Sequence, residues 1–222
     1  MVRIADSFGL TDMNDATSPG GREKGVKVAI RNAWRKFTKR TASALARSSG
    51  AELLTATRLG LGFADGEYVI DLARRQVRDR MGMPASDRRE LLILHYLAGA
   101  KNIKPSGTVI GFGQIAEVRT YEPVFKARTL GRLVRAFGDD PERLIDAARP
   151  LGGVLGDAGD VSAVLDLFPR IPVTVVMWRG DDEFPCDGNI LFDSTVTEHL
   201  PLEDIVVGCE ELVSALVAKA GS

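Results

Sequence analysis

The sequence predicts an α+β protein, in which a mostly antiparallel sheet with β-hairpins packs against four to six helices. Two observations predict this class. Residues 59–72 and 163–178 each hold two apolar segments that flank turn residues, which is typical of hairpins. Other segments repeat apolar residues every three or four positions, which is typical of amphipathic helices. Residues 1–22 are predicted to be a flexible lead, and residues 23–222 a single α+β domain.

The composition is that of a soluble globular protein. Of the 222 residues, 45% are hydrophobic and 27% are charged, and the apolar runs are shorter than the roughly 18 residues that cross a bilayer. The polar N-terminal stretch shows no signal-peptide core, so we expect a cytoplasmic protein without a membrane span. Two cysteines, Cys186 and Cys209, form neither a disulfide framework nor a CxxC pair, and we expect reduced thiols.

Charge is distributed unevenly along the chain. Residues 1–150 carry 26 Lys and Arg against 17 Asp and Glu, whereas residues 151–222 carry 3 against 13. This asymmetry indicates either two halves that attract each other or two partner surfaces of opposite charge. The basic residues are spread out with few aromatic residues between them, so nucleic-acid binding is not expected.

Residues 26–50 are predicted to form one amphipathic helix. Val26, Ile30 and Trp34 begin an apolar stripe, and Gly50 is placed to end the helix. Most of its cations lie off that stripe. They are interpreted as a solvated face, and the alternative is a basic surface for an interaction module that works through Arg31, Arg35 and Lys39.

The next segment, TRLGLGFADGEYVIDLA, predicts a hairpin. The pair Asp65-Gly66 is typical of a type I′ turn, in which both central residues have positive φ. Gly60 and Gly62 do not indicate a nucleotide site, because the dinucleotide fingerprint needs a helix directly after its glycines.

A buried central helix is predicted at residues 87–99. Asp87 and Glu90 have the spacing of an N-terminal cap, and the apolar residues that follow leave almost no polar face. His95 lies within this run. A histidine in such a position is interpreted as a hydrogen-bonded core residue more readily than as a ligand.

The remaining elements follow in order. We expect a short strand or turn at residues 109–112, an irregular stretch near Tyr121, short helices at 129–138 and 140–152, two strands around the turn at 169–172, a candidate third strand at 189–193 and a last helix after Pro201.

The segment 179–204 is dense in acidic residues. Turn chemistry explains Asp181, Asp182 and Glu183, and the helix dipole explains the acidic pair that follows Pro201. The segment matches no standard metal-ligand spacing, so a metal site would require residues that converge only in the fold. Nothing in the spacing places Cys186 beside His199 as a nucleophile and its base.

Five segments carry a family resemblance: LLILHYLAGA, SGTVIGFGQI, YEPVF, GDDEFPCDGNILFD and HLPLEDI. In this order they resemble the bacterial and archaeal family known as domain of unknown function 3786, over residues 26–219. The resemblance implies no established activity, a setting in anaerobes and, for some members, a cysteine-rich iron–sulfur segment. With two cysteines this chain lacks the four thiolates of an ordinary cluster, so we expect no iron–sulfur cluster within it.

Three functions remain open. The leading hypothesis is a non-catalytic binding or accessory protein for a small molecule or cofactor, in the anaerobic corrinoid or one-carbon metabolism that the resemblance implies, with a corrinoid or a protein as its partner. The polar residues predicted to line its site are His95, Tyr96, Tyr121, Glu183, Asp193 and His199. The alternatives are a metal-assisted hydrolase that uses Asp193, His199 and Glu203, and a pure protein-interaction module.

Overall fold

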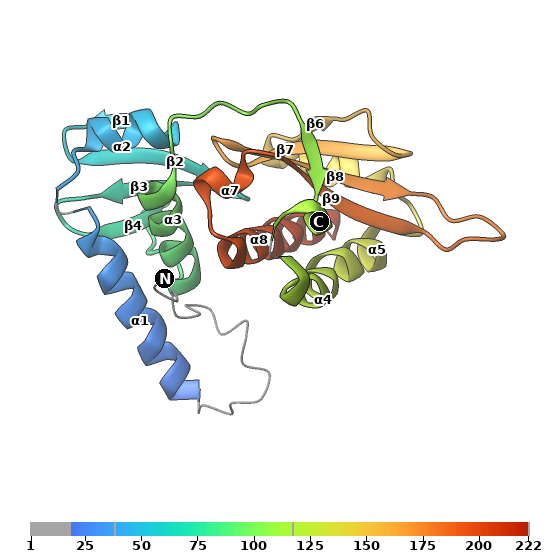
Figure 1. The fold of residues 1–222 in the computed structure, drawn as a ribbon, viewed down its shortest axis with the longest axis horizontal. Coiled ribbons are helices and arrows are strands. Elements are labelled where there is room, and N and C mark those ends of the chain that lie inside the picture. The colour runs from blue at the N-terminus through green and yellow to red at the C-terminus, as the bar shows by residue number, and fades with distance from the viewer. Residues whose placement is uncertain (1–18, 38, 117, 222) are drawn as a thin grey trace. The chain divides into compact units, whose positions relative to one another are not determined.

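The protein contains two antiparallel sheets, of four and five strands, together with helices, which confirms the predicted α+β class (Figure 1). The computed structural model describes residues 19–37, 39–116 and 118–221. The chain divides into two compact units. Unit 1 contains the described residues up to Leu61 together with Glu67–Asn102, and unit 2 contains Gly62–Gly66 and the residues from Ile103 onward.

Two predictions concern how the chain is divided. Residues 1–18 of the predicted lead lie outside the described residues, and residues 19–22 begin a helix. The expectation of a single domain over residues 23–222 stays a prediction, because it concerns how the two units combine.

The four-stranded sheet has the order β1-β2-β3-β4. Its strands are β1 (Glu52–Thr55), β2 (Arg58–Phe63), β3 (Gly66–Asp71) and β4 (Gln76–Asp79). The predicted hairpin between β2 and β3 is present, but the prediction of a type I′ turn at Asp65-Gly66 was wrong. Among these turn residues the positive φ belongs to Ala64, at 51°, so the turn lies one residue earlier than the Asp-Gly pair predicts.

The helix predicted over residues 26–50 consists of two helices, α1 (Pro19–Arg35) and α2 (Ala42–Ser49). The break has a local cause, because the Thr41 side chain accepts a hydrogen bond from the backbone N–H of Ala44 at 3.2 Å and thereby starts a new helix. Gly50 ends α2 with φ of 77°, as predicted. Arg31, Arg35 and Lys39 are exposed, in agreement with a solvated face.

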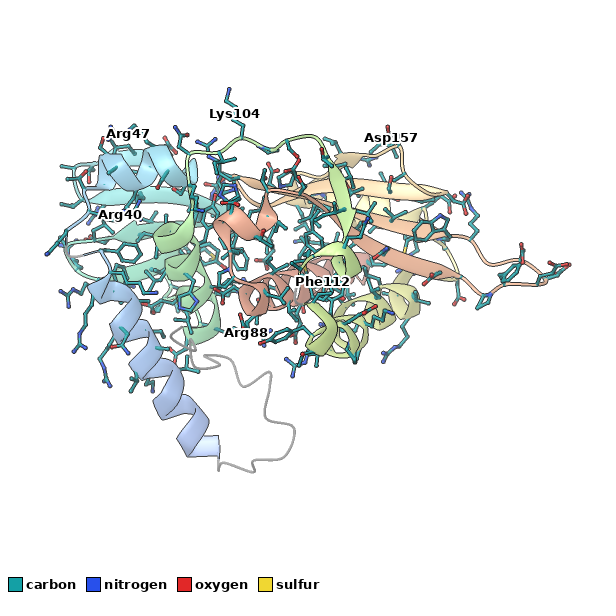
Figure 2. The ribbon with its side chains drawn as sticks, in the orientation of Figure 1. Arg40, Arg47, Arg88, Lys104, Phe112 and Asp157 are labelled. Carbon is teal, nitrogen blue, oxygen red and sulfur yellow. The ribbon has the colours of Figure 1, made fainter. Side chains whose placement is uncertain are left out.

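The central helix α3 (Asp87–Gly99) is buried as predicted. Its apolar residues Leu91, Leu92, Ile93, Leu94, Tyr96 and Leu97 are all buried. The cap is one residue earlier than expected: Ser86, and not Asp87, accepts a hydrogen bond from the N–H of Arg89. At the other end, the Arg40 guanidinium (Figure 2) donates to the carbonyls of Leu97 and Ala98, where a cation complements the helix dipole.

Unit 2 is built on the five-stranded sheet, with the order β5-β9-β8-β7-β6. Its strands are β5 (Val109–Gly111), β6 (Val154–Leu155), β7 (Val161–Phe168), β8 (Ile171–Trp178) and β9 (Asp187–Asp193). The long hairpin β7–β8 and the third strand β9 confirm the strands predicted for this part of the chain. Residues 187–192 of β9 pair with β8, from Trp178↔Asp187 to Val173↔Phe192.

Helices cover this sheet (Figure 1). The helices of unit 2 are α4 (Glu122–Phe125), α5 (Gly131–Phe137), α6 (Arg143–Ala148), α7 (Val196–His199) and the long α8 (Leu202–Ala220), with short helical turns η1 (Phe112–Gln114), η2 (Val118–Thr120) and η4 (Arg149–Leu151). A π-helical turn, η3 (Lys126–Leu130), joins α4 to α5. The helix predicted to begin near Thr129 therefore starts at Glu122, and the Thr129 hydroxyl donates to the Phe125 carbonyl within the π-helical turn.

Aromatic stacking fixes the core of unit 2. Phe63, from the β2–β3 turn region, stacks on Phe168 with ring centroids 4.7 Å apart. Phe112 stacks on Phe125 at 3.9 Å, and Phe192 of β9 lies 6.3 Å from Phe125. This second cluster ties the start of the helical segment α4–η3–α5 to the sheet.

Among the described residues, no helix combines the length and the apolar character needed to cross a membrane.

Candidate ligand-binding groove

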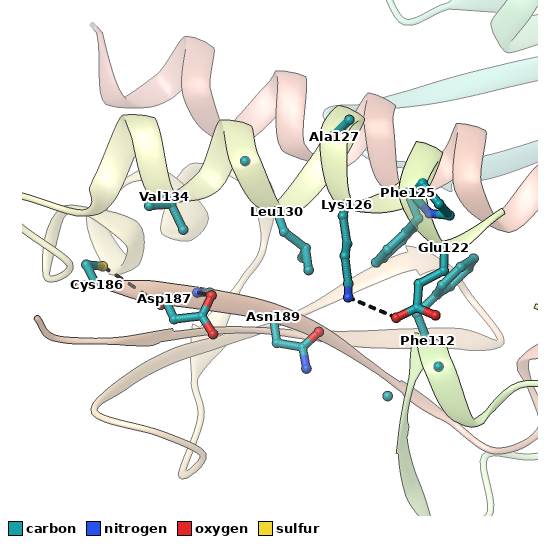
Figure 3. A pocket seen from close by; sticks show the side chains of 15 residues that line it. Phe112, Glu122, Phe125, Lys126, Ala127, Leu130, Val134, Cys186, Asp187 and Asn189 are labelled. Carbon is teal, nitrogen blue, oxygen red and sulfur yellow. Dashed lines mark hydrogen bonds and ion pairs between the residues drawn. The ribbon is translucent and has the colours of Figure 1, made fainter. Parts of the chain in front are cut away.

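A groove of about 890 Å³ lies within unit 2, between strand β9 and the helical segment α4–η3–α5 (Figure 3). Its volume is typical of sites for small organic ligands. It is lined by Gly111, Phe112, Gly113, Glu122, Pro123, Phe125, Lys126, Ala127, Leu130, Gly131, Val134, Cys186, Asp187, Gly188 and Asn189. Two smaller pockets, each of about 370 Å³, lie in unit 1.

The helical wall presents Lys126, Leu130 and Val134 toward β9 (Figure 3). These residues are four positions apart, so they lie on one face of the helical segment. The segment contains the π-helical turn η3, and such turns frequently occur at functional sites because they shift the side chains that follow. The wall therefore combines an apolar surface with one lysine.

The opposite wall is an open strand edge. Strand β5 pairs only with the last part of β9, and its final partner pair is Gly111↔Leu191. After Gly111 the chain turns into η1, and the Gln114 side chain accepts a hydrogen bond from the Gly111 N–H at 2.7 Å. Residues 187–190 of β9 thus pair with β8 on one side and lie beyond the end of β5 on the other, and residues 187–189 line the groove.

Charged groups lie at both ends of the groove. At one end, Lys126 Nζ is 2.9 Å from Glu122 Oε1. At the other end, burial and then the carboxylates of Asp187 and Asp139 raise the pKa of the Cys186 thiol. Cys186 is therefore a neutral thiol at neutral pH and a poor nucleophile.

The residues predicted from the sequence lie outside the lining of this groove. In unit 1, Tyr96 is buried and its hydroxyl donates to the Ser49 carbonyl at 2.5 Å, and His95 is half-buried on α3. In unit 2, the Tyr121 hydroxyl donates to Glu203 Oε1 at 2.6 Å. His199 is buried in α7, and Glu183 is exposed in the β8–β9 loop.

Asp193 has a defined role in the fold. Its carboxylate accepts hydrogen bonds from the backbone N–H groups of Ser106, Gly107 and Thr195 at 2.7–3.0 Å, and from the hydroxyls of Ser106 and Thr195. Burial acts to raise its pKa, but these hydrogen bonds outweigh burial and hold the pKa well below its usual range. Asp193 therefore clamps the loop before β5 to the end of β9.

The turn interpretation of the acidic loop is confirmed for Asp181. Asp181 accepts hydrogen bonds from the N–H groups of Glu183 and Phe184. Within the described part of the chain, no three His, Cys, Asp or Glu side chains are grouped as a metal site would require. Among these described residues, the three named for the metal-hydrolase alternative are not grouped in this way, and Asp193 and Glu203 accept hydrogen bonds within unit 2.

Sequence reasoning missed the polar groups of the groove, above all Lys126, Asp187 and Asn189. A signal for their place was nevertheless present. Ten of the fifteen lining residues belong to three of the five segments that carry the family resemblance, namely SGTVIGFGQI, YEPVF and GDDEFPCDGNILFD. These segments are distant in the chain and meet at this groove.

The fold and the groove define an α+β protein with a site of small-molecule size in its second unit. The chain belongs to the family described as domain of unknown function DUF3786, whose model matches residues 41–215. This match confirms the resemblance read from the sequence. No curated protein and no solved structure matches the chain.

Proposed function

We propose that this protein is a non-catalytic binding protein that holds a small organic molecule in the groove between β9 and the α4–η3–α5 segment. The observation that carries the proposal is the meeting of three distant segments at one groove of about 890 Å³, with an aromatic floor and a few polar groups. This combination is typical of ligand sites, in which apolar surface supplies affinity and polar groups fix orientation.

The polar groups support binding better than catalysis. Those that line the groove are an ion pair, Glu122 with Lys126, a carboxylate, Asp187, an amide, Asn189, and the neutral thiol of Cys186. A covalent mechanism needs a nucleophile beside a base that activates it, and the lining of the groove does not supply that pair.

The proposal also includes a metabolic setting for the protein. Anaerobic corrinoid or one-carbon metabolism is supported by the family resemblance alone, and it decides which compounds are tested first. The groove carries the proposal, in place of the six polar residues predicted from the sequence, because its lining forms a continuous surface within one unit.

Filling the groove tests the proposal. The probes are a library of water-soluble metabolites that includes cobalamin and folates, measured by thermal unfolding. A ligand present at 100 times its Kd should stabilise the wild-type protein by about 2.7 kcal/mol. Ala127→Trp, which places an indole in the groove from an exposed position on the helical wall, should weaken that ligand by at least about tenfold, a loss of about 1.4 kcal/mol.

Arg135→Trp is the matched control, because Arg135 is exposed on α5 and does not line the groove. It should bind the ligand as the wild type does. Unchanged affinity in Ala127→Trp would place the ligand elsewhere, and a library without any stabilising compound would count against a small-molecule site.

A further inference from the structure

We propose that the ligand of the groove is a short peptide with a free amino terminus, which binds as an added strand along the open edge of β9. This inference rests on the proposed function, namely that the groove is a ligand site. It names the chemical class that the groove recognises, and it follows from the backbone of residues 187–190.

The open edge of β9 carries backbone N–H groups beyond the residues that β5 pairs, next to the groove. Beyond the end of β9, the N–H of Ser194 donates to the Thr108 carbonyl, on the side where β5 lies. Successive residues of a strand direct their N–H groups to opposite edges, and the β8–β9 register has no irregularity. The N–H groups of Gly188 and Ile190 therefore face the same edge as that of Ser194, beyond the point where β5 has ended.

Both of these N–H groups are capped by the preceding side chain. Asp187 Oδ1 accepts from the Gly188 N–H at 2.8 Å, and Asn189 Oδ1 accepts from the Ile190 N–H at 2.8 Å. Each side-chain oxygen is thus the acceptor that a carbonyl of a neighbouring strand would otherwise supply. Such local contacts satisfy an open edge and are exchangeable for the carbonyls of an added strand.

An extended peptide matches this pair of donors. Its carbonyls on one edge repeat every second residue, about 6.8 Å apart, which is also the spacing of the Gly188 and Ile190 amides along β9. Addition of a strand to a free sheet edge is a known mode of peptide recognition, in which main-chain hydrogen bonds give affinity and pockets select side chains. Leu130 and Val134 on the opposite wall supply apolar surface for those side chains.

The charges at one end select a free amino terminus. When a peptide carbonyl replaces Asp187 Oδ1 at the Gly188 N–H, the Asp187 carboxylate is released beside Cys186, a thiol that also feels the charge of Asp139. An ammonium group is the complement of these carboxylates. The peptide would then start near Asp187 and run parallel to β9. The open edge, residues 187–190, spans about 10 Å, which is long enough for a tri- or tetrapeptide.

The test uses the full chain and a positional library of tetrapeptides with free amino termini, together with the N-acetylated copy of each peptide that binds. In ¹⁵N-labelled protein, a bound tetrapeptide should shift the amide resonances of Gly188 and Ile190 and slow their hydrogen exchange. Asp187→Asn keeps an acceptor oxygen but removes the charge, so it should weaken the free-amine peptide by about tenfold, as should acetylation. Asp182→Asn, in the exposed β8–β9 loop, is the control and should bind as the wild type does.

The outcomes separate this inference from the proposed function. Small molecules that bind in an Ala127→Trp-sensitive manner, with no tetrapeptide binding, would overturn the peptide assignment and leave the groove as a ligand site. Failure of both libraries would overturn both proposals. Equal affinity for acetylated and free peptides would overturn the free amino terminus, and it would point to an internal segment of a partner protein as the added strand.

Discussion

Replacement of Asp193 by Ala is expected to lower the free energy of unfolding of unit 2 by about 3 kcal/mol. The substitution removes the acceptor of three backbone N–H groups, those of Ser106, Gly107 and Thr195. A hydrogen bond to a charged group contributes about 1.5–3 kcal/mol, and these bonds are partly buried. The predicted loss of about 3 kcal/mol is smaller than the sum for three such hydrogen bonds, because water can reach part of this clamp and solvate the released N–H groups.

Urea denaturation monitored by circular dichroism measures this change, and Asp193→Asn is the control. The amide keeps one acceptor oxygen without the charge, so its loss should be roughly half as large. If Asp193→Ala unfolds at the same urea concentration as the wild type, the carboxylate does not clamp β9 to the loop before β5.

The same clamp predicts a pH dependence. The pKa of Asp193 is lowered in the folded state, so its carboxylate adds stability at every pH above the unfolded pKa of about 4. That contribution is lost as the pH falls from about 4 through the folded pKa. The difference in stability between the wild type and Asp193→Asn should therefore be constant from pH 5 to 8 and should narrow below pH 4. A difference that stays constant down to pH 2 would contradict a lowered pKa.

Replacement of Phe125 by Ala is expected to have the largest effect on stability, about 3–5 kcal/mol. The side chain is fully buried, stacks on Phe112 and lies close to Phe192. Its removal leaves a cavity beneath the groove, between the helical segment and the sheet. Phe125→Leu retains most of the volume and should cost about 1 kcal/mol.

Thermal and urea unfolding of the two variants measure the difference. Phe112 and Phe125 form the floor of the groove. Because leucine keeps this floor apolar and retains most of its volume, the ligand affinity of Phe125→Leu should stay close to that of the wild type. A loss of stability in Phe125→Ala no larger than in Phe125→Leu would show that the aromatic cluster does not hold the helical segment on the sheet.

Local patterns predicted much of the fold. Strong hairpin and helix signals identified β2–β3, β7–β8, β9, α3 and α8, because apolar periodicity reflects which face of each element is buried. The errors have local causes that periodicity does not contain. Thr41 starts a second helix inside one apolar stripe, and Ala64 adopts a positive φ that the adjacent Asp-Gly pair was expected to provide.

The candidate site was harder to predict than the fold. The sequence directed attention to histidine, tyrosine and acidic side chains, whereas the groove depends on where β5 ends relative to β9. Where β5 ends depends on how the strands pair, which apolar periodicity does not reveal. The backbone amides of Gly188 and Ile190 are likewise present whatever the side chain, so no residue type in the sequence marks them. In the sequence, Cys186 was weighed only as a nucleophile beside His199. That it lines a groove follows from the fold alone.

The two cysteines allow the central claim to be tested directly. Cys186 lines the groove, whereas Cys209 is fully buried in α8, where burial raises the pKa of its thiol. Alkylation of the native protein by iodoacetamide at alkaline pH, which ionises part of the Cys186 thiol, should modify Cys186 and leave the buried Cys209 unmodified, as measured by mass spectrometry, because alkylation needs an accessible thiolate. A ligand identified by thermal unfolding should slow the alkylation of Cys186 in proportion to its occupancy. A ligand that stabilises the protein while Cys186 reacts at its original rate would contradict the account, because its site would lie outside the groove.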